Sequence, residues 1–160
     1  MPKKKDTRPP RTDPEEKATL LGFLDYLRGA VAAKVEGVPD PEVRAAGVPS
    51  GTNLLGLVKH LACVERFIFL GEDVEDWDAT FRPAAEETVS GVLADYRTAV
   101  GQANKVIEAY SDLTRPAPQA AGRRSASSMR WALVHMIEET GRHAGHADIL
   151  REQIDGATGR

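Results

Sequence analysis

Apolar residues recur at intervals of three and four along most of the chain, which is the period of an amphipathic helix. In the first run, Leu20, Leu24 and Val31 follow a proline and two glutamates of the kind that open helices. Glycine and proline interrupt the chain between the runs. The pattern predicts four long helices, over about residues 14–36, 54–71, 86–110 and 127–154.

The segments between these runs have no regular period. Residues 72–83 mix acidic and aromatic side chains, and residues 111–127 are rich in proline, glycine and serine, so both predict loops. One short helical turn is expected within residues 40–46. Because the sequence lacks alternating apolar and polar positions, we expect an all-α protein, a four-helix bundle formed by residues 13–160.

The charge of the chain is unevenly distributed. The net charge of the 160 residues is −3, yet residues 1–12 carry a net charge of +4 together with three prolines, so the remainder is acidic. We expect residues 1–12 to form a flexible basic tail, with a nucleic-acid-binding arm as the alternative. The acidic body argues against a nucleic-acid partner.

Composition narrows the class of protein further. The 41% of apolar residues against 28% charged ones indicates a globular core that needs no metal to fold, so a metal would serve chemistry. The single cysteine excludes an intramolecular disulfide and a thiol zinc cluster. No run approaches the roughly 18 apolar residues of a membrane span, and no signal peptide is recognisable. We therefore expect a cytoplasmic protein without a membrane partner.

Histidines carry the strongest sign of chemistry. Three of the four lie within twelve residues of the predicted fourth helix, where His135, Glu139 and His143 share a face and His146 follows three residues later. His60 lies on the apolar face of the predicted second helix. If these helices pack together, His60 meets Glu139 and His143. Two imidazoles and a carboxylate are a common ligand set for Zn²⁺, and Ni²⁺ fits nearly as well.

Other roles fit the same residues. A histidine on a core-facing position is often simply hydrogen-bonded. Glu139 could equally pair with Arg142 or Arg130 on the helix surface. The four-residue spacing also leaves open whether His135 or His143 is the partner of Glu139.

The roles of three more residues stay open between two interpretations, and a fourth residue is expected to be structural. Cys63 fits either a core position or a soft fourth ligand, and the core position is the simpler reading. Trp77 and Phe81, in the predicted loop after the second helix, cover a pocket or cap the core. Trp131 is expected in the core.

Two segments resemble the DinB-like superfamily when they are taken together. They are residues 54–66, which begin LLGLVKHL, and residues 130–148, which begin RWALVHMIEE. The opening segment, residues 18–26, is similar too. Within the superfamily the chain resembles an actinobacterial branch and the metal-binding domain of mycothiol-dependent maleylpyruvate isomerase.

The resemblance implies a metal-binding four-helix bundle, often a homodimer, with one ligand on the second long helix and two on the fourth. Many relatives have two histidines four residues apart on the last helix, whereas this chain has Glu139 at the first position, as the isomerase relatives do. By that match the metal ligands are His60, Glu139 and His143. His146 stands where other members carry glutamine, and it is expected to line the pocket.

The resemblance also implies an activity. A bound dication lowers the pKa of a coordinated water or thiol. The chain is therefore expected to be a metal-dependent enzyme that acts on a small electrophile, as a mycothiol-type thiol S-transferase or an isomerase-like enzyme, with a low-molecular-weight thiol as cofactor. Arg130, Arg142 and His146 are the expected cofactor-binding residues. The alternative is a non-catalytic metal-binding or stress-associated bundle dimer.

Overall fold

The four predicted helices are all present in the computed structural model, which describes residues 7–11, 14–123 and 125–159. They are α1 (Glu16–Val35), α2 (Leu54–Glu65), α4 (Val89–Glu108) and α5 (Met129–Asp155). Three shorter segments are η1 (Glu42–Arg44), η2 (Arg66–Leu70) and α3 (Trp77–Thr80). No strand occurs in the described residues, so the prediction of an all-α protein is confirmed. Within the same residues, no helix is both long and apolar enough to cross a membrane.

Each long helix begins at a side chain that accepts hydrogen bonds from the first backbone N–H groups, which have no partner inside the helix. The four capping residues are Glu15, Asn53, Thr88 and Ser128. Because capping is a local interaction, the sequence places the start of every long helix within three residues of its position in the structure.

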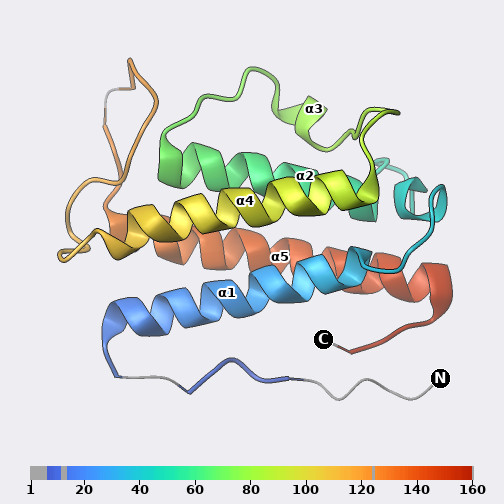
Figure 1. Ribbon diagram of the computed structural model, residues 1–160, viewed down its shortest axis with the longest axis horizontal. Coiled ribbons are helices and arrows are strands. Elements are labelled where there is room, and N and C mark those ends of the chain that lie inside the picture. The colour runs from blue at the N-terminus through green and yellow to red at the C-terminus, as the bar shows by residue number, and fades with distance from the viewer. Residues whose placement is uncertain (1–6, 12–13, 124, 160) are drawn as a thin grey trace.

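The long helices lie side by side, with α1 packed against α5 and α2 packed against α4 (Figure 1). In Figure 1, α1 and α5 run in one direction while α2 and α4 run in the other. The chain therefore returns along the bundle between α2 and α4, in a crossover segment formed by residues 71–88. This crossover carries α3 and lies over α2.

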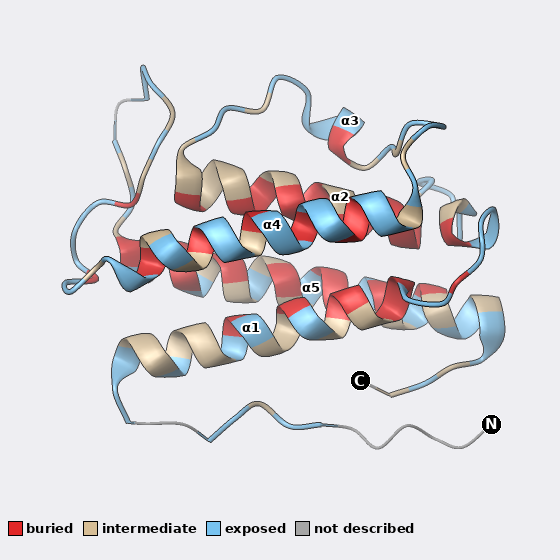
Figure 2. Ribbon diagram, in the orientation of Figure 1, coloured by how far each residue is buried: buried red, intermediate tan, exposed pale blue. Residues whose placement is uncertain are grey.

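Buried residues follow the inward faces of the four long helices, and exposed residues follow their outer faces (Figure 2). Two apolar clusters form the core, one containing Val31, Leu61 and Leu93 and the other containing Leu24 and Met136. Burial of this apolar surface is the main force that holds the helices together. Side chains on the inward face of α2 and α5 are thereby held in fixed positions.

The structure differs from the predictions at two elements. The second helix ends at Gly71, as predicted, but its last turn, η2, is π-helical, and Gly71 has φ 68°. The segment 72–83 is not wholly irregular, because it contains α3, whose first turn is capped by the Asp76 carboxylate.

Trp131 is not a core residue, contrary to the prediction. It is 52% exposed, since the face of α5 on which it lies turns outward from the bundle. The predicted flexible tail, residues 1–12, lies largely outside the described residues. Of the part that is described, the Thr7 carbonyl accepts a hydrogen bond from the Tyr26 hydroxyl of α1 at 2.8 Å.

Candidate metal centre

Three predicted ligands converge between α2 and α5. His60 Nε2 lies 3.2 Å from Glu139 Oε1, and His143 Nε2 lies 3.0 Å from the same oxygen. One ligand atom from each of the three residues lies within 4.8 Å of the other two. His60 and His143 are buried, and Glu139 is partly exposed. The structure therefore brings together His60, Glu139 and His143, which we call the triad.

The triad combines one local and one tertiary feature. Glu139 and His143 are four residues apart on α5, and this spacing alone places them on one helix face. His60 comes from α2, which packs against α5. The structure also separates the two histidines that spacing left equivalent, because His135 stacks on Trp131 and lies near Glu138 instead of joining the triad.

The proton on the His60 ring can be assigned from its neighbours. The Thr80 hydroxyl donates its only hydrogen to the Trp77 carbonyl at 2.5 Å, so toward His60 it acts as an acceptor. His60 Nδ1 lies 2.7 Å from this hydroxyl and therefore carries the proton. In the neutral imidazole, Nε2 is then left with a lone pair that faces Glu139. Sequence analysis missed Thr80, which lies in a segment without periodicity.

Gly56 allows the crossover segment to reach His60. A Cβ at this position would lie 2.2 Å from the Phe81 carbonyl oxygen, which is backbone and has little freedom to move. With glycine there, the crossover packs directly on α2, one turn before His60. This contact brings both Thr80 and Phe81 onto the His60 ring.

Aromatic rings cover the His60 side of the triad. The Phe81 ring stacks on the His60 ring with centroids 3.8 Å apart, and the Trp77 ring meets His60 edge-on at 6.0 Å. Phe81 also lies 5.9 Å from the His143 ring. Of the two roles predicted for Trp77 and Phe81, the structure therefore supports the one in which they cover a site.

The protonation states of the triad suit metal binding. Burial lowers the pKa of His60 and of His143, against the opposing influence of the Glu139 carboxylate, so both rings favour the neutral form. Burial would raise the pKa of Glu139, but the neighbouring His60 and His143 rings outweigh burial and lower that pKa. Neutral imidazole and ionised carboxylate are the forms that bind divalent cations.

The donor atoms fit a tetrahedral cation. Zn²⁺ bonds of about 2.0–2.1 Å in a tetrahedron place neighbouring ligand atoms about 3.3 Å apart. The distances from Glu139 Oε1 to the two Nε2 atoms, 3.2 and 3.0 Å, are close to this spacing. A hydrogen-bond acceptor on the second ring nitrogen, as Thr80 provides for His60, is typical of metal-bound histidines. The triad therefore has the donor set and surroundings expected of a three-ligand metal site.

Three further predicted residues lie near the triad or on its helix. His146 is exposed, and its Nδ1 lies 3.3 Å from His143 Nδ1. Arg130 donates to both carboxylate oxygens of Glu16, and Arg142 pairs with Glu138, both on exposed parts of the surface. The role of these three residues in cofactor binding remains a prediction.

Cys63 does not approach the triad. It is half-buried beside Lys59 and Arg66, and burial raises the pKa of its thiol against the influence of these two cations. A raised pKa keeps the thiol protonated at neutral pH, which is unfavourable for metal ligation. The structural role favoured for Cys63 agrees with this environment.

Two grooves flank the triad along α5. One, of about 420 Å³, is lined by residues that include His135 and Trp131. The other, of about 240 Å³, is lined by His146 and by Val48, Ile149 and Leu150. Since His135 precedes Glu139 by one turn and His146 follows His143 by one turn, the grooves lie at opposite ends of the triad.

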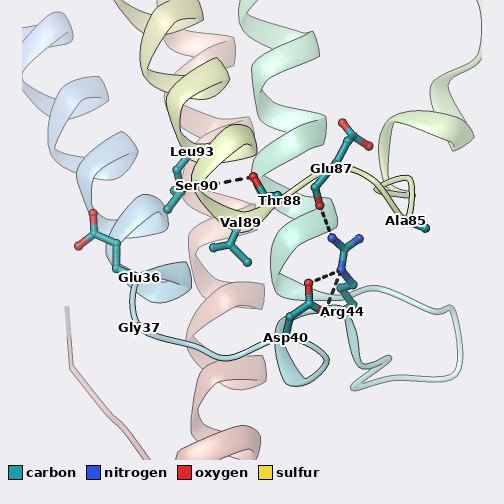
Figure 3. A pocket seen from close by; sticks show the side chains of 10 residues that line it. All are labelled: Glu36, Gly37, Asp40, Arg44, Ala85, Glu87, Thr88, Val89, Ser90 and Leu93. Carbon is teal, nitrogen blue, oxygen red and sulfur yellow. Dashed lines mark hydrogen bonds and ion pairs between the residues drawn. The ribbon is translucent and has the colours of Figure 1, made fainter.

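A larger cavity of about 540 Å³ lies between the end of α1 and the start of α4 (Figure 3). Its lining includes the carboxylates of Glu36, Asp40 and Glu87, and none of the predicted site residues. Arg44, the cation in this lining, is held by the Asp40 carboxylate and the Glu87 carbonyl. The Glu36 carboxylate pairs with Arg97 and the Glu87 carboxylate pairs with Lys59, so the cavity lacks the convergent free donors and acceptors of the triad.

Comparison with known families agrees with the geometry. A family model described as Mycothiol-S-transferase, one of the DinB-like families, matches residues 19–156. This range includes all three members of the triad. A search of curated proteins found no match.

Proposed function

Because the chain belongs to the mycothiol S-transferase family, we propose that it catalyses attack by the sulfur of a mycothiol-type thiol on a small electrophile, using a divalent cation held by His60, Glu139 and His143. Zn²⁺ and Ni²⁺ are the proposed cations, since both suit nitrogen and oxygen ligands. A divalent cation at this position would lower the pKa of a coordinated thiol and so supply thiolate at neutral pH.

One observation carries the proposal of a cation. The Thr80 hydroxyl oxygen accepts a hydrogen bond from His60 Nδ1–H, so the Nε2 lone pair faces the ionised Glu139 oxygen at 3.2 Å. Two acceptors at hydrogen-bond distance repel each other unless a positive charge lies beside both. A shared cation relieves this repulsion and also uses His143 Nε2.

The chain's own residues provide the setting for the reaction. Phe81 and Trp77 exclude water from one side of the triad. We assign the electrophile to the groove beside His146, because Val48, Ile149 and Leu150 make it largely apolar. In the overall transfer to an aryl chloride, the S–C bond forms and the C–Cl bond breaks, chloride leaves with the bonding electrons, and the thiol proton passes to solvent.

The test combines metal analysis with a thiol-consumption assay. Elemental analysis of protein purified without added metal is expected to find about one divalent ion per chain. With mycothiol and 1-chloro-2,4-dinitrobenzene, the protein is expected to form the aryl thioether, and removal of metal by a chelator is expected to abolish the reaction.

Matched carboxylate variants make this test specific. Glu139→Gln is expected to lose the metal and the activity, since an amide is a weaker ligand than a carboxylate. Glu138→Gln alters the adjacent carboxylate, which pairs with Arg142 on the surface, and is expected to retain both. Metal content that does not change in Glu139→Gln contradicts the ligand set. Bound metal without any thiol consumption favours the non-catalytic metal-binding alternative.

A further inference from the structure

We infer that the slot between α1 and α4 is a second binding site, which takes a small neutral molecule with an apolar ring and a carbonyl oxygen. We call it the α1–α4 slot, and the residues that carry the argument are Arg28, Gly29, Ala32, Glu36, Tyr96 and Arg97. Its volume of about 370 Å³ lies within the range of about 300–1,000 Å³ common for small-molecule sites. Its lining comes from α1 and α4, whereas the triad lies between α2 and α5.

The packing of the helices leaves this side of the bundle open. α1 packs against α5 and α2, and α4 packs against α2, but α1 and α4, which are both fully described, do not pack closely on each other. In Figure 1, part of α5 is visible between them. The slot is lined by Gly29, Ala32 and Ala33 of α1 and by Val100 of α4. These small and apolar residues leave room for a ligand and suit its ring.

Two polar bridges join α1 and α4 at the ends of the slot. At one end, Arg28 donates to the Asn104 amide oxygen at 2.7 Å. At the other end, Arg97 donates to the Glu36 carboxylate at 2.5 Å. Eight residues of α1 separate Arg28 from Glu36, a rise of about 12 Å. This length suits a molecule of one ring and a short polar arm.

A buried hydroxyl in the lining of the slot has no partner. Tyr96 is 1% exposed, and its hydroxyl makes no hydrogen bond to any described residue. Burial and the Glu65 carboxylate raise the pKa of Tyr96, so the hydroxyl keeps its proton at neutral pH and is a donor. An unpaired buried hydroxyl destabilises the folded state. A carbonyl oxygen of a ligand that lies against Tyr96 would accept this hydrogen bond.

The charges around the slot favour a neutral ligand. The Arg28 guanidinium pairs with Glu65 and with Asp25. Glu36 and Arg97 pair with each other. A charged ligand would therefore lose its hydration without meeting an unpaired opposite charge among these residues.

The test titrates 3-phenylpropanamide into isotope-labelled full-length protein and follows the backbone amides by NMR. Saturable shifts are expected at Gly29, Ala32 and Val100. A chelator is expected to leave these shifts unchanged, because the slot does not include the triad. The anion of similar shape, 3-phenylpropanoate, is expected to bind at least about tenfold more weakly, since its carboxylate loses hydration.

Two exposed glycines provide a matched pair of variants. Gly29→Leu places a side chain in the slot, and Gly101→Leu makes the same change on α4 outside its lining. At both positions a Cβ would meet no atom within 4 Å, and leucine favours a helix more than glycine does, so both variants are expected to fold. Gly29→Leu is expected to lose saturable binding, and Gly101→Leu is expected to bind 3-phenylpropanamide as wild type does.

Tyr96→Phe tests the role of the unpartnered hydroxyl. We expect this variant to raise the Tm of the ligand-free protein, because a buried donor without a partner is removed. We expect it also to weaken the binding of 3-phenylpropanamide about fivefold, because one hydrogen bond to the ligand is lost. A raised Tm with unchanged binding would show that the hydroxyl does not contact the ligand, and would overturn the proposal.

Three further outcomes would overturn it. The first is an absence of saturable shifts in wild type, or equal binding by wild type and Gly29→Leu. The second is binding that is lost in Glu139→Gln, which would place the ligand at the triad. The third is a change in sedimentation of Gly29→Leu but not of Gly101→Leu, which would assign the slot to a second copy of the chain. Thiol consumption is expected to be equal in Gly29→Leu and wild type, so the proposed function and this inference fail separately.

Discussion

Two polar clusters each include one buried residue of α2, Glu65 in one and His60 in the other, and they differ in how completely their side chains are paired. Glu65 is fully buried, and both of its carboxylate oxygens accept from Arg28 of α1, at 2.7 and 2.6 Å. Arg28 also donates to Asp25 and to Asn104, each at 2.7 Å. In this cluster every charge meets an opposite charge or a hydrogen-bond acceptor.

The triad lies little more than one turn away on α2 and has the opposite character. His60 Nε2, His143 Nε2 and Glu139 Oε1 point toward a common position, and the proton of His60 is used elsewhere. Glu139 also retains contact with solvent. A buried charge with all of its partners stabilises one conformation, whereas a group of facing acceptors is completed by a ligand. The four predictions below test this difference between a closed and an open cluster.

Removing a charge from the closed cluster should have the largest effect on stability. Glu65→Gln removes the fully buried counter-ion of Arg28 and leaves it only the exposed Asp25 carboxylate, so we expect the free energy of unfolding to fall by about 3–5 kcal/mol. Urea unfolding measures this change. The metal content of the molecules that remain folded should equal that of wild type, because Glu65 is not part of the triad. A loss below 1 kcal/mol would show that the two clusters do not differ as we describe.

Substitution of a residue that supports the triad should change its affinity for a metal ion. Thr80→Val removes the hydroxyl that accepts the His60 Nδ1 proton, so the proton can move to Nε2 and compete with the metal. We expect Zn²⁺ affinity, measured by competition with a chelator, to fall by roughly 10- to 100-fold. Thr80→Ser keeps the hydroxyl and is the control. Equal affinities in Thr80→Val and wild type would refute the assigned tautomer.

Acidification should weaken the metal-free protein in a defined pH range. The pKa values of His60 and His143 are lowered in the folded state, so the folded state binds fewer protons than the unfolded state. This contribution to stability is present above the unfolded pKa of about 6.5 and is lost as the pH falls below it. Glu139, whose pKa is lowered from 4.5, acts only at lower pH.

Unfolding of metal-free protein in urea at about pH 7.5 and about pH 5.5 tests the sign. We expect the free energy of unfolding to be lower at the acidic pH, and the decrease to be smaller in the double variant His60→Gln with His143→Gln. A decrease of the same size in both proteins would mean that other groups cause it.

Ion pairs on the exposed surface of α5 should contribute least to the free energy of unfolding. Arg142 pairs with Glu138 across one turn, and both side chains are exposed. Arg142→Ala is therefore expected to change the free energy of unfolding by less than about 0.5 kcal/mol and to leave metal content unchanged. Thermal unfolding and elemental analysis check both statements. A rise in the KM for mycothiol in this variant would support the predicted role of Arg142 in attracting a cofactor.

Local chemistry explains why much of the fold could be predicted. Helix periods and capping residues depend on neighbours within four positions, so the four long helices appear close to where the sequence predicts them. The π-helical turn η2 and the exposure of Trp131 depend on how distant segments pack. Neither leaves a signal in the local pattern. The second helix ends at Gly71 as predicted, although in a π-helical turn, and the prediction that Trp131 lies in the core was wrong.

In the triad, too, one part depends on local spacing and the other part depends on tertiary packing. By itself the sequence determined that Glu139 and His143 share a face of α5, because a four-residue spacing on a helix has one geometric result. Only the tertiary structure decided that His60 faces them, that His135 does not take part, and that Thr80 orients the His60 ring. These contacts join residues 20 to 79 positions apart. The contact to Glu139 depends on the packing of α2 on α5, and the contact to Thr80 depends on the crossover packing closely on Gly56, which no local preference encodes.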